Sequence, residues 1–264
     1  MRKIVKWILT GILIFIFFIL FSFGLDSAVE HVILSSKISS FKKKAVYQEN
    51  ISSYYVKYYK IEMEDEEPGY TMYNNRMLPG NCGDIICSPD SNFFKGMFFG
   101  EMLCDFMGYF VGGHAAIVLD SYQDYEINVT ADDTVESTVT SGYSPAFITN
   151  RDYWNSTDYF TEVIGYRAPL TDTEMDDLLS VAVGQEGDFY NSTFTFNTKN
   201  KSYCSDLITK VYKRYGINTN KDGYWTTVWD IMTSPDLDIV YYHKVIGDIK
   251  YIYYVEWGEY IWHM

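Results

Sequence analysis

Cys204 is the residue of this sequence best placed for nucleophilic chemistry. It opens the stretch 204–215, in which Leu207 and Val211 belong to an apolar face and charged residues fall opposite. The spacing predicts an amphipathic helix with Ser202 as its N-cap and the thiol in the first turn. Free backbone N–H groups and the positive end of the helix dipole favour a thiolate there. A cysteine on such a face is more often a small buried apolar residue, so the chemistry requires partners elsewhere.

His114 stands at the start of a second informative pattern. It begins a continuous apolar run over 114–120, which predicts a buried strand, and 125–130 alternates as a neighbouring strand. The short turn between them predicts a hairpin in which side chains beside His114 come from alternate positions such as Glu126 or Asn128. A lone histidine at a strand end is more often structural, so this position alone does not define a site.

The remaining patterns predict the elements that position these residues. Apolar residues indicate a short strand over 85–87 and a Phe- and Met-rich helix over 93–110, which we expect to fill the core. A capping box formed by Thr171 and Glu174 opens a helix that ends near 184. Alternation predicts closing strands over 238–245, 249–256 and 260–263, and a further strand is possible over 54–62. The expected fold is α+β, with helices packed against an antiparallel half-barrel.

Composition excludes several classes of function. The chain has 264 residues and is 47% hydrophobic, which suffices for one substantial core. Its 21 basic against 35 acidic residues argue against a general nucleic-acid binder. There is no glycine-rich phosphate loop, serine elbow or His-Glu-x-x-His helix, and nothing indicates a metal or an organic cofactor. Two of Cys82, Cys87 and Cys104 can form a disulfide outside the cell, and their spacing leaves the pairing open.

The N-terminus predicts a membrane anchor. Arg2, Lys3 and Lys6 precede the 19 uncharged residues of 7–25, which as a helix would span about 28 Å of bilayer. The positive flank places the remainder outside the cytoplasm. A cleaved signal peptide is the alternative, and the protein would then be secreted. The predicted organisation is an anchor over 1–25, a juxtamembrane stalk over 26–69 and a folded domain over 70–264.

The order of several motifs resembles a known family. Pro-Gly-x-x-Gly-Asp-Ile-Ile at 79–86, Gly-His-Ala-Ala-Ile-Val at 113–118 and Tyr-Cys-Ser-Asp-Leu at 203–207 follow one another along the chain. This order is similar to that of the circularly permuted papain-fold cysteine hydrolases of the NlpC type, in the YiiX/YebB-like branch. The resemblance covers about 78–242, and each motif is weak without the others.

The resemblance implies roles for three residues. It makes Cys204 the nucleophile and His114 the general base, while a third polar residue orients the imidazole. Asn128 falls where this branch usually carries an acidic residue, and Glu126 is the second choice for that position. The backbone N–H of Cys204 would serve as one oxyanion donor.

These observations predict a membrane-anchored, outward-facing cysteine hydrolase that needs no cofactor. The family resemblance implies a peptidase or amidase that cleaves a peptide or cell-wall peptide amide. An enzyme acting on a lipid acyl group is the nearest alternative, because the apolar segment 93–110 would suit a fatty chain. A catalytically silent binding or scaffold module with the same fold is the alternative of a different class. The oligomeric state stays open.

Overall fold

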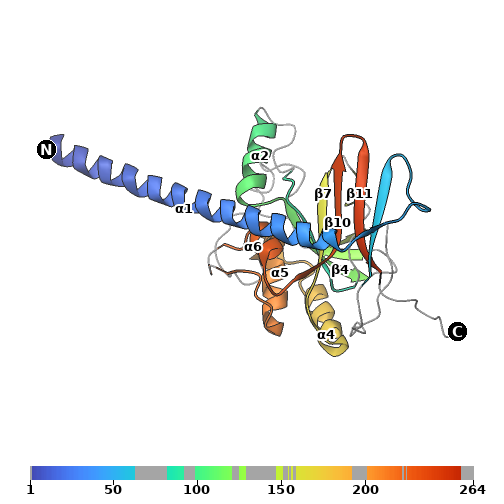
Figure 1. Ribbon diagram of the computed structural model, residues 1–264. Coiled ribbons are helices and arrows are strands. Elements are labelled where there is room, and N and C mark those ends of the chain that lie inside the picture. Colours follow the sequence, from blue (N-terminus) through green and yellow to red (C-terminus); the bar gives the residue numbers. More distant parts are fainter. Residues whose placement is uncertain are drawn as a thin grey trace.

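A computed structural model describes most of the chain. The described residues are 2–62, 82–91, 99–120, 125–128, 147–150, 154, 156, 159–191, 201–221, 223 and 225–256. Within them the fold is α+β, as predicted, with helices packed on one large sheet (Figure 1). The strand predicted over 260–263 lies outside the described residues.

The main sheet has nine strands in the order β1-β2-β11-β10-β7-β3-β4-β5-β6. All pairings are antiparallel except that of β2 with β11, which is parallel. A second sheet pairs β8 with β9. The strands are β1 (Val46–Tyr47), β2 (Val56–Glu62), β3 (Ile85–Ser88), β4 (His114–Asp120), β5 (Tyr125–Asn128), β6 (Phe147–Asn150), β7 (Glu162–Arg167), β8 (Phe189–Tyr190), β9 (Lys201–Ser202), β10 (Asp238–Ile246) and β11 (Ile249–Glu256).

The helices form where the sequence supplies apolar faces and caps. They are α1 (Arg2–Lys43), α2 (Gly100–Phe110), α4 (Asp172–Val183), α5 (Cys204–Tyr212) and α6 (Val228–Thr233), with a 3-10 turn, η2 (Lys213–Tyr215), after α5. The predicted capping box of α4 is confirmed, because the Thr171 hydroxyl accepts from the backbone N–H of Glu174 and the Glu174 carboxylate accepts from Thr171. Thr227 and Asp230 form the same motif at the start of α6.

The two faces of the central strands carry different clusters. Ile85, Cys87, Ala115 and Ile117 point to the front face, where they join the large core cluster that contains the buried side of α5. Ile86, Ala116 and Val118 point to the rear face, where they pack with Trp154, Phe160 and Val163. Because strand side chains alternate between faces, this register fixes which residues of β4 can meet α5.

α1 is one continuous helix that begins before the apolar run and ends at Lys43. Its outer part extends away from the sheet (Figure 1), where large apolar side chains such as Trp7 and Phe17 are exposed. Among the residues whose placement is described, no helix combines the length and apolar character needed to cross a membrane. The expected transmembrane helix over 7–25 is therefore not found. The run forms the outer section of a longer helix whose inner section packs on the folded domain.

The stretch predicted to be a stalk contributes to the folded domain. Leu34, Ile38 and Phe41 of α1 are buried in the front core cluster. Lys37 donates hydrogen bonds to the carbonyls of Ser234 and Leu237, at 2.7 and 2.9 Å, and so ties α1 to the segment after α6. Strand β2, from the same stretch, is part of the main sheet.

Candidate active site and adjoining cavity

Cys204 is the first residue of α5, as the amphipathic pattern predicts. The N-cap is Tyr203 rather than Ser202, so that detail of the prediction was wrong. The Tyr203 carbonyl accepts the first helical bond, from Leu207 N at 2.9 Å, and no side chain caps the helix. Ser202 lies in β9 instead, where its hydroxyl accepts from Lys210 Nζ at 3.0 Å.

The thiol of Cys204 lies at the junction of α5 with β4. It is partly buried, and burial raises its pKa above the usual value. Hydrogen bonds involving the Ala115 backbone, the Ser205 backbone and side chain, and its own backbone act in the opposite direction and stabilise a thiolate. The N–H of Ala115 belongs to the peptide unit that joins Ala115 to His114. The backbone at the start of β4 therefore contacts the thiol directly.

The imidazole of His114 points to the rear of β4. It stacks on Trp154 with the ring centroids 5.6 Å apart and an interplanar angle of 9°. Trp154 belongs to the rear cluster, whereas Ala115 and Cys204 belong to the front one. Burial lowers the pKa of His114 from 6.5 to about 4, so this ring is neutral at pH 7. In this arrangement the side chains of His114 and Cys204 lie on opposite faces of the strand and are not brought together.

The predicted third residue lies on β5, which pairs with β4 as the hairpin prediction requires. Val118 is opposite Glu126 and Ile117 is opposite Ile127, and Asn128 is the last residue of the strand. The side chains of β5 lie outside the described set. The choice between Asn128 and Glu126 as the orienting residue therefore stays a prediction.

Two other cysteines are described, and both are free thiols. Cys82 is partly exposed and donates to the Leu119 carbonyl at 3.0 Å. Cys87 is buried on the front face of β3, opposite Ala115. Burial is the main reason that the pKa of the Cys87 thiol is raised, and the nearby Cys204 thiol raises it by a smaller amount. A disulfide between Cys82 and Cys87 is therefore absent, and the side chain of Cys104 lies outside the described set.

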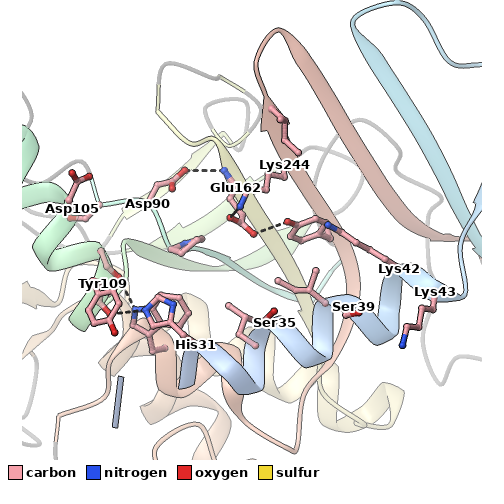
Figure 2. Close-up of a pocket in the computed structure, with 18 residues that line it drawn as sticks. His31, Ser35, Ser39, Lys42, Lys43, Asp90, Asp105, Tyr109, Glu162 and Lys244 are labelled. Atoms are coloured by element: carbon pink, nitrogen blue, oxygen red, sulfur yellow. Dashed lines mark hydrogen bonds and ion pairs between the residues drawn. The ribbon is translucent and has the colours of Figure 1, made fainter. Parts of the chain in front are cut away.

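A large cavity adjoins this region, between the inner part of α1 and the domain. Its volume is about 1030 Å³, and α2, β7, β10 and the start of α6 supply its other walls (Figure 2). Neither Cys204 nor His114 is among the residues that line it. Pro89 and Asp90, which do line it, lie next to Gly113: a Cβ there would approach the Asp90 carbonyl oxygen to 1.8 Å. The cavity therefore lies beside the turn that leads into β4.

The sequence analysis did not predict the aromatic contacts that line the cavity next to the candidate active site. Trp229 is buried in α6 and donates its indole N–H to the Gly108 carbonyl at 2.8 Å. His31 stacks on Tyr109 with the ring centroids 4.5 Å apart and makes a tilted contact with Trp229 at 4.0 Å. The capping box formed by Thr227 and Asp230 is a sequence pattern from which α6 could have been predicted. No local sequence pattern indicates that α1 contacts Tyr109 or Trp229.

The Phe- and Met-rich segment also behaves differently from the expectation of core filling. Within the described part of this segment, Phe99, Met102 and Phe106 expose more than half of their surface. These side chains face away from the core, although the helical prediction is confirmed over Gly100–Phe110.

A cysteine at a helix start packed against an antiparallel sheet is the arrangement of papain-like cysteine hydrolases. A family model described as "Permuted papain-like amidase enzyme, YaeF/YiiX, C92 family" matches residues 102–237, just over half of the chain. The chain belongs to this family of cysteine-peptidase-type amidases and is thus an amide hydrolase. Comparisons with curated proteins and with solved structures give no match.

Proposed function

We propose that this amidase uses Cys204 as its nucleophile and His114 as its general base, and that its substrate is a peptide amide. The observation that carries the proposal is the contact between the thiol and the peptide unit joining His114 to Ala115. Of the other described histidines, His31 contacts the rings of Tyr109 and Trp229, and His243 forms a hydrogen bond with the Tyr241 hydroxyl. His114 is therefore the histidine whose backbone adjoins the nucleophile.

The proposed reaction begins when the imidazole takes the thiol proton. The thiolate Sγ attacks the amide carbonyl carbon, and the N–H groups of the first turn of α5 stabilise the oxyanion in this scheme. The imidazolium then protonates the leaving amine, and water hydrolyses the thioester to release the acid. For these reaction steps to occur, the ring of His114 has to leave Trp154 and turn to the front of β4.

The turn before β4 supports such a movement. Gly112 and Gly113 precede His114 directly, and Gly112 has φ +82°, a left-handed conformation that favours glycine. His114 is itself paired with Ser88 of β3, so redirecting the imidazole opens this first pair of the strand while Ala115 onward stays paired with β3.

The test is the alkylation rate of each cysteine by iodoacetamide as a function of pH, resolved by mass spectrometry. In the structure burial raises the pKa of Cys204, so a lowered value requires the His114 ring to turn to the front of β4. With the ring turned, we expect the Cys204 thiolate to titrate below the roughly 8.5 of a free cysteine, and to return towards or above that value in His114→Ala. Cys82, the other partly exposed thiol described, is the internal control and should be unaffected. A Cys204 that titrates above 8.5 in both proteins would refute the assignment of His114.

Hydrolysis provides the second measurement. Wild type and Cys204→Ala are incubated with a panel of peptides and of N-acyl amides, and the released amine is quantified. Peptide cleavage that disappears in Cys204→Ala and persists in Cys82→Ala supports the proposal. Release of amine from fatty-acyl amides alone would assign the enzyme to lipid substrates instead.

A further inference from the structure

The cavity beneath α1 has charged groups of opposite sign at its two ends. Asp90 and Asp105 lie at the end near α2, and Lys42 and Lys43 lie at the end near β10, with Glu162 between them (Figure 2). The inner part of α1 runs along the cavity from one end to the other and presents Ser35 and Ser39 on the way.

At the basic end, Lys42 and Lys43 carry positive charge that no ion pair within the described part of the chain neutralises. Glu162 accepts from Lys244 Nζ at 2.6 Å and from the Tyr242 hydroxyl at 2.8 Å, so its two oxygens are already engaged. Lys42 Nζ lies 4.2 Å from the centroid of the Tyr242 ring. Burial lowers the pKa of Lys42, although the charge of Glu162 opposes this effect. No ion pair to Lys42 or Lys43 occurs among the described residues.

The acidic end of the cavity carries negative charge on Asp90 and Asp105. Oδ2 of Asp90 accepts from the Thr161 N–H and hydroxyl and from the Glu162 N–H, at 2.5, 2.8 and 2.9 Å. These donors are neutral, so they leave the negative charge in place. Asp105 is exposed and makes no ion pair with any residue in the described ranges. A ligand cation at this end would meet two carboxylates.

The length of the cavity indicates how long a ligand must be to reach both charged ends. From His31 to Lys43 the helix rises about 18 Å, which equals the length of about five extended residues. Between the charged ends the walls include the apolar groups of Leu34, Ile38 and Trp229, which suit the side chains of such a ligand. The volume also falls at the upper end of ordinary ligand sites.

We propose that the cavity binds a short zwitterionic peptide of about five residues. Its ammonium terminus lies at Asp90 and Asp105, and its carboxylate terminus lies at Lys42 and Lys43. The site is separate from Cys204 and does not depend on the proposed catalytic assignment.

The experiment is isothermal titration calorimetry of the full chain carrying Cys204→Ala, which removes the proposed nucleophile. The probe is the peptide Ala-Leu-Ala-Leu-Ala with free termini, compared with its N-acetylated and its C-amidated forms. We expect the free peptide to bind and each cap to weaken binding about tenfold, because each removes one charged contact with the site. Absence of binding at millimolar peptide, or equal affinity for the three forms, would overturn the proposal.

Matched variants establish the direction in which the peptide lies. In the variant carrying Lys42→Met and Lys43→Met together, amidation should no longer matter while acetylation still weakens binding. Asp105→Asn should reduce the effect of acetylation and leave the effect of amidation intact. Lys44→Met and Asp176→Asn, whose side chains lie outside the cavity, should behave as the parent. A control variant that loses as much affinity as its cavity counterpart would show that general charge explains the binding.

Discussion

Protonation of His114 distinguishes the stacked arrangement of the structure from the catalytic arrangement. Stacked on Trp154, the ring is shielded from water, which lowers its pKa from 6.5 to about 4. Paired with the Cys204 thiolate, the ring would be stabilised as imidazolium, and its pKa would rise above 6.5. The two arrangements therefore predict shifts of opposite sign. Titration of the His114 ring by NMR measures the sign directly, and His114→Gln assigns the resonance.

The stacked arrangement also predicts a loss of stability in acid. Above pH 6.5 the ring is neutral in both the folded and unfolded chain, so the full stability is present. As the pH falls from 6.5 to about 4, the unfolded chain takes up the proton first, and folding is penalised progressively. The lowered pKa corresponds to about 3 kcal/mol of unfolding free energy lost across this window.

Urea unfolding at pH 7.5 and pH 4.5 checks this magnitude. The stability of wild type should fall between the two pH values by about 2–3 kcal/mol more than that of His114→Gln, which cannot titrate there. His243, whose pKa burial also lowers, is present in both proteins, so its contribution cancels in the comparison. Equal losses in the two proteins, together with an NMR pKa above 6.5, would refute the stacked arrangement.

Two further predictions concern the framework that holds the site. Asp84→Asn should lower the unfolding free energy by about 3–5 kcal/mol in urea, because it removes the charge partner of the buried Arg167 guanidinium, which donates to both carboxylate oxygens at 2.8 and 2.7 Å. Adding Arg167→Met should recover much of that loss, and a double variant no more stable than Asp84→Asn would contradict the explanation. Thr171→Ala should cost about 1 kcal/mol by thermal unfolding through loss of the α4 cap, whereas the exposed Thr173→Ala should change little.

The strands and helices around the nucleophile were predictable because their signals are local. The apolar run at 114–120 and the capping box at Thr171 each contain the information that forms the element, and both elements occur where predicted. The closing hairpin, Asp238–Ile246 with Ile249–Glu256, also follows from alternation alone.

The elements that were missed depend on contacts distant in sequence. β7 was not predicted, although it lies between β3 and β10 in the centre of the sheet. Its sequence, Glu162–Arg167, is short and contains Gly165, so the burial that makes it a strand comes only from its neighbours. The inner part of α1 was interpreted as a stalk for a similar reason, since its buried residues have partners some 200 positions later.

The side of the sheet to which His114 points could not be predicted from the sequence, for a different reason. The sequence places it correctly at the start of β4, and the family order pairs it with Cys204 in function. Which side of the sheet a first strand residue faces is determined by register against β3, and a change of one position reverses it. The aromatic partner on the rear side, Trp154, has no recognisable motif in the sequence.

The parallel pairing of β2 with β11 has a consequence for how the protein is made. Val56 lies beside Lys250, so a strand synthesised early has to wait for one synthesised about 190 residues later. Until then β2 presents an unpaired edge that carries the adjacent Tyr58 and Tyr59, which is a surface prone to pairing between nascent chains. Loop closure of this length is also slow relative to local hairpins. Assembly of the sheet should therefore end with β2 docking onto the finished β10–β11 hairpin.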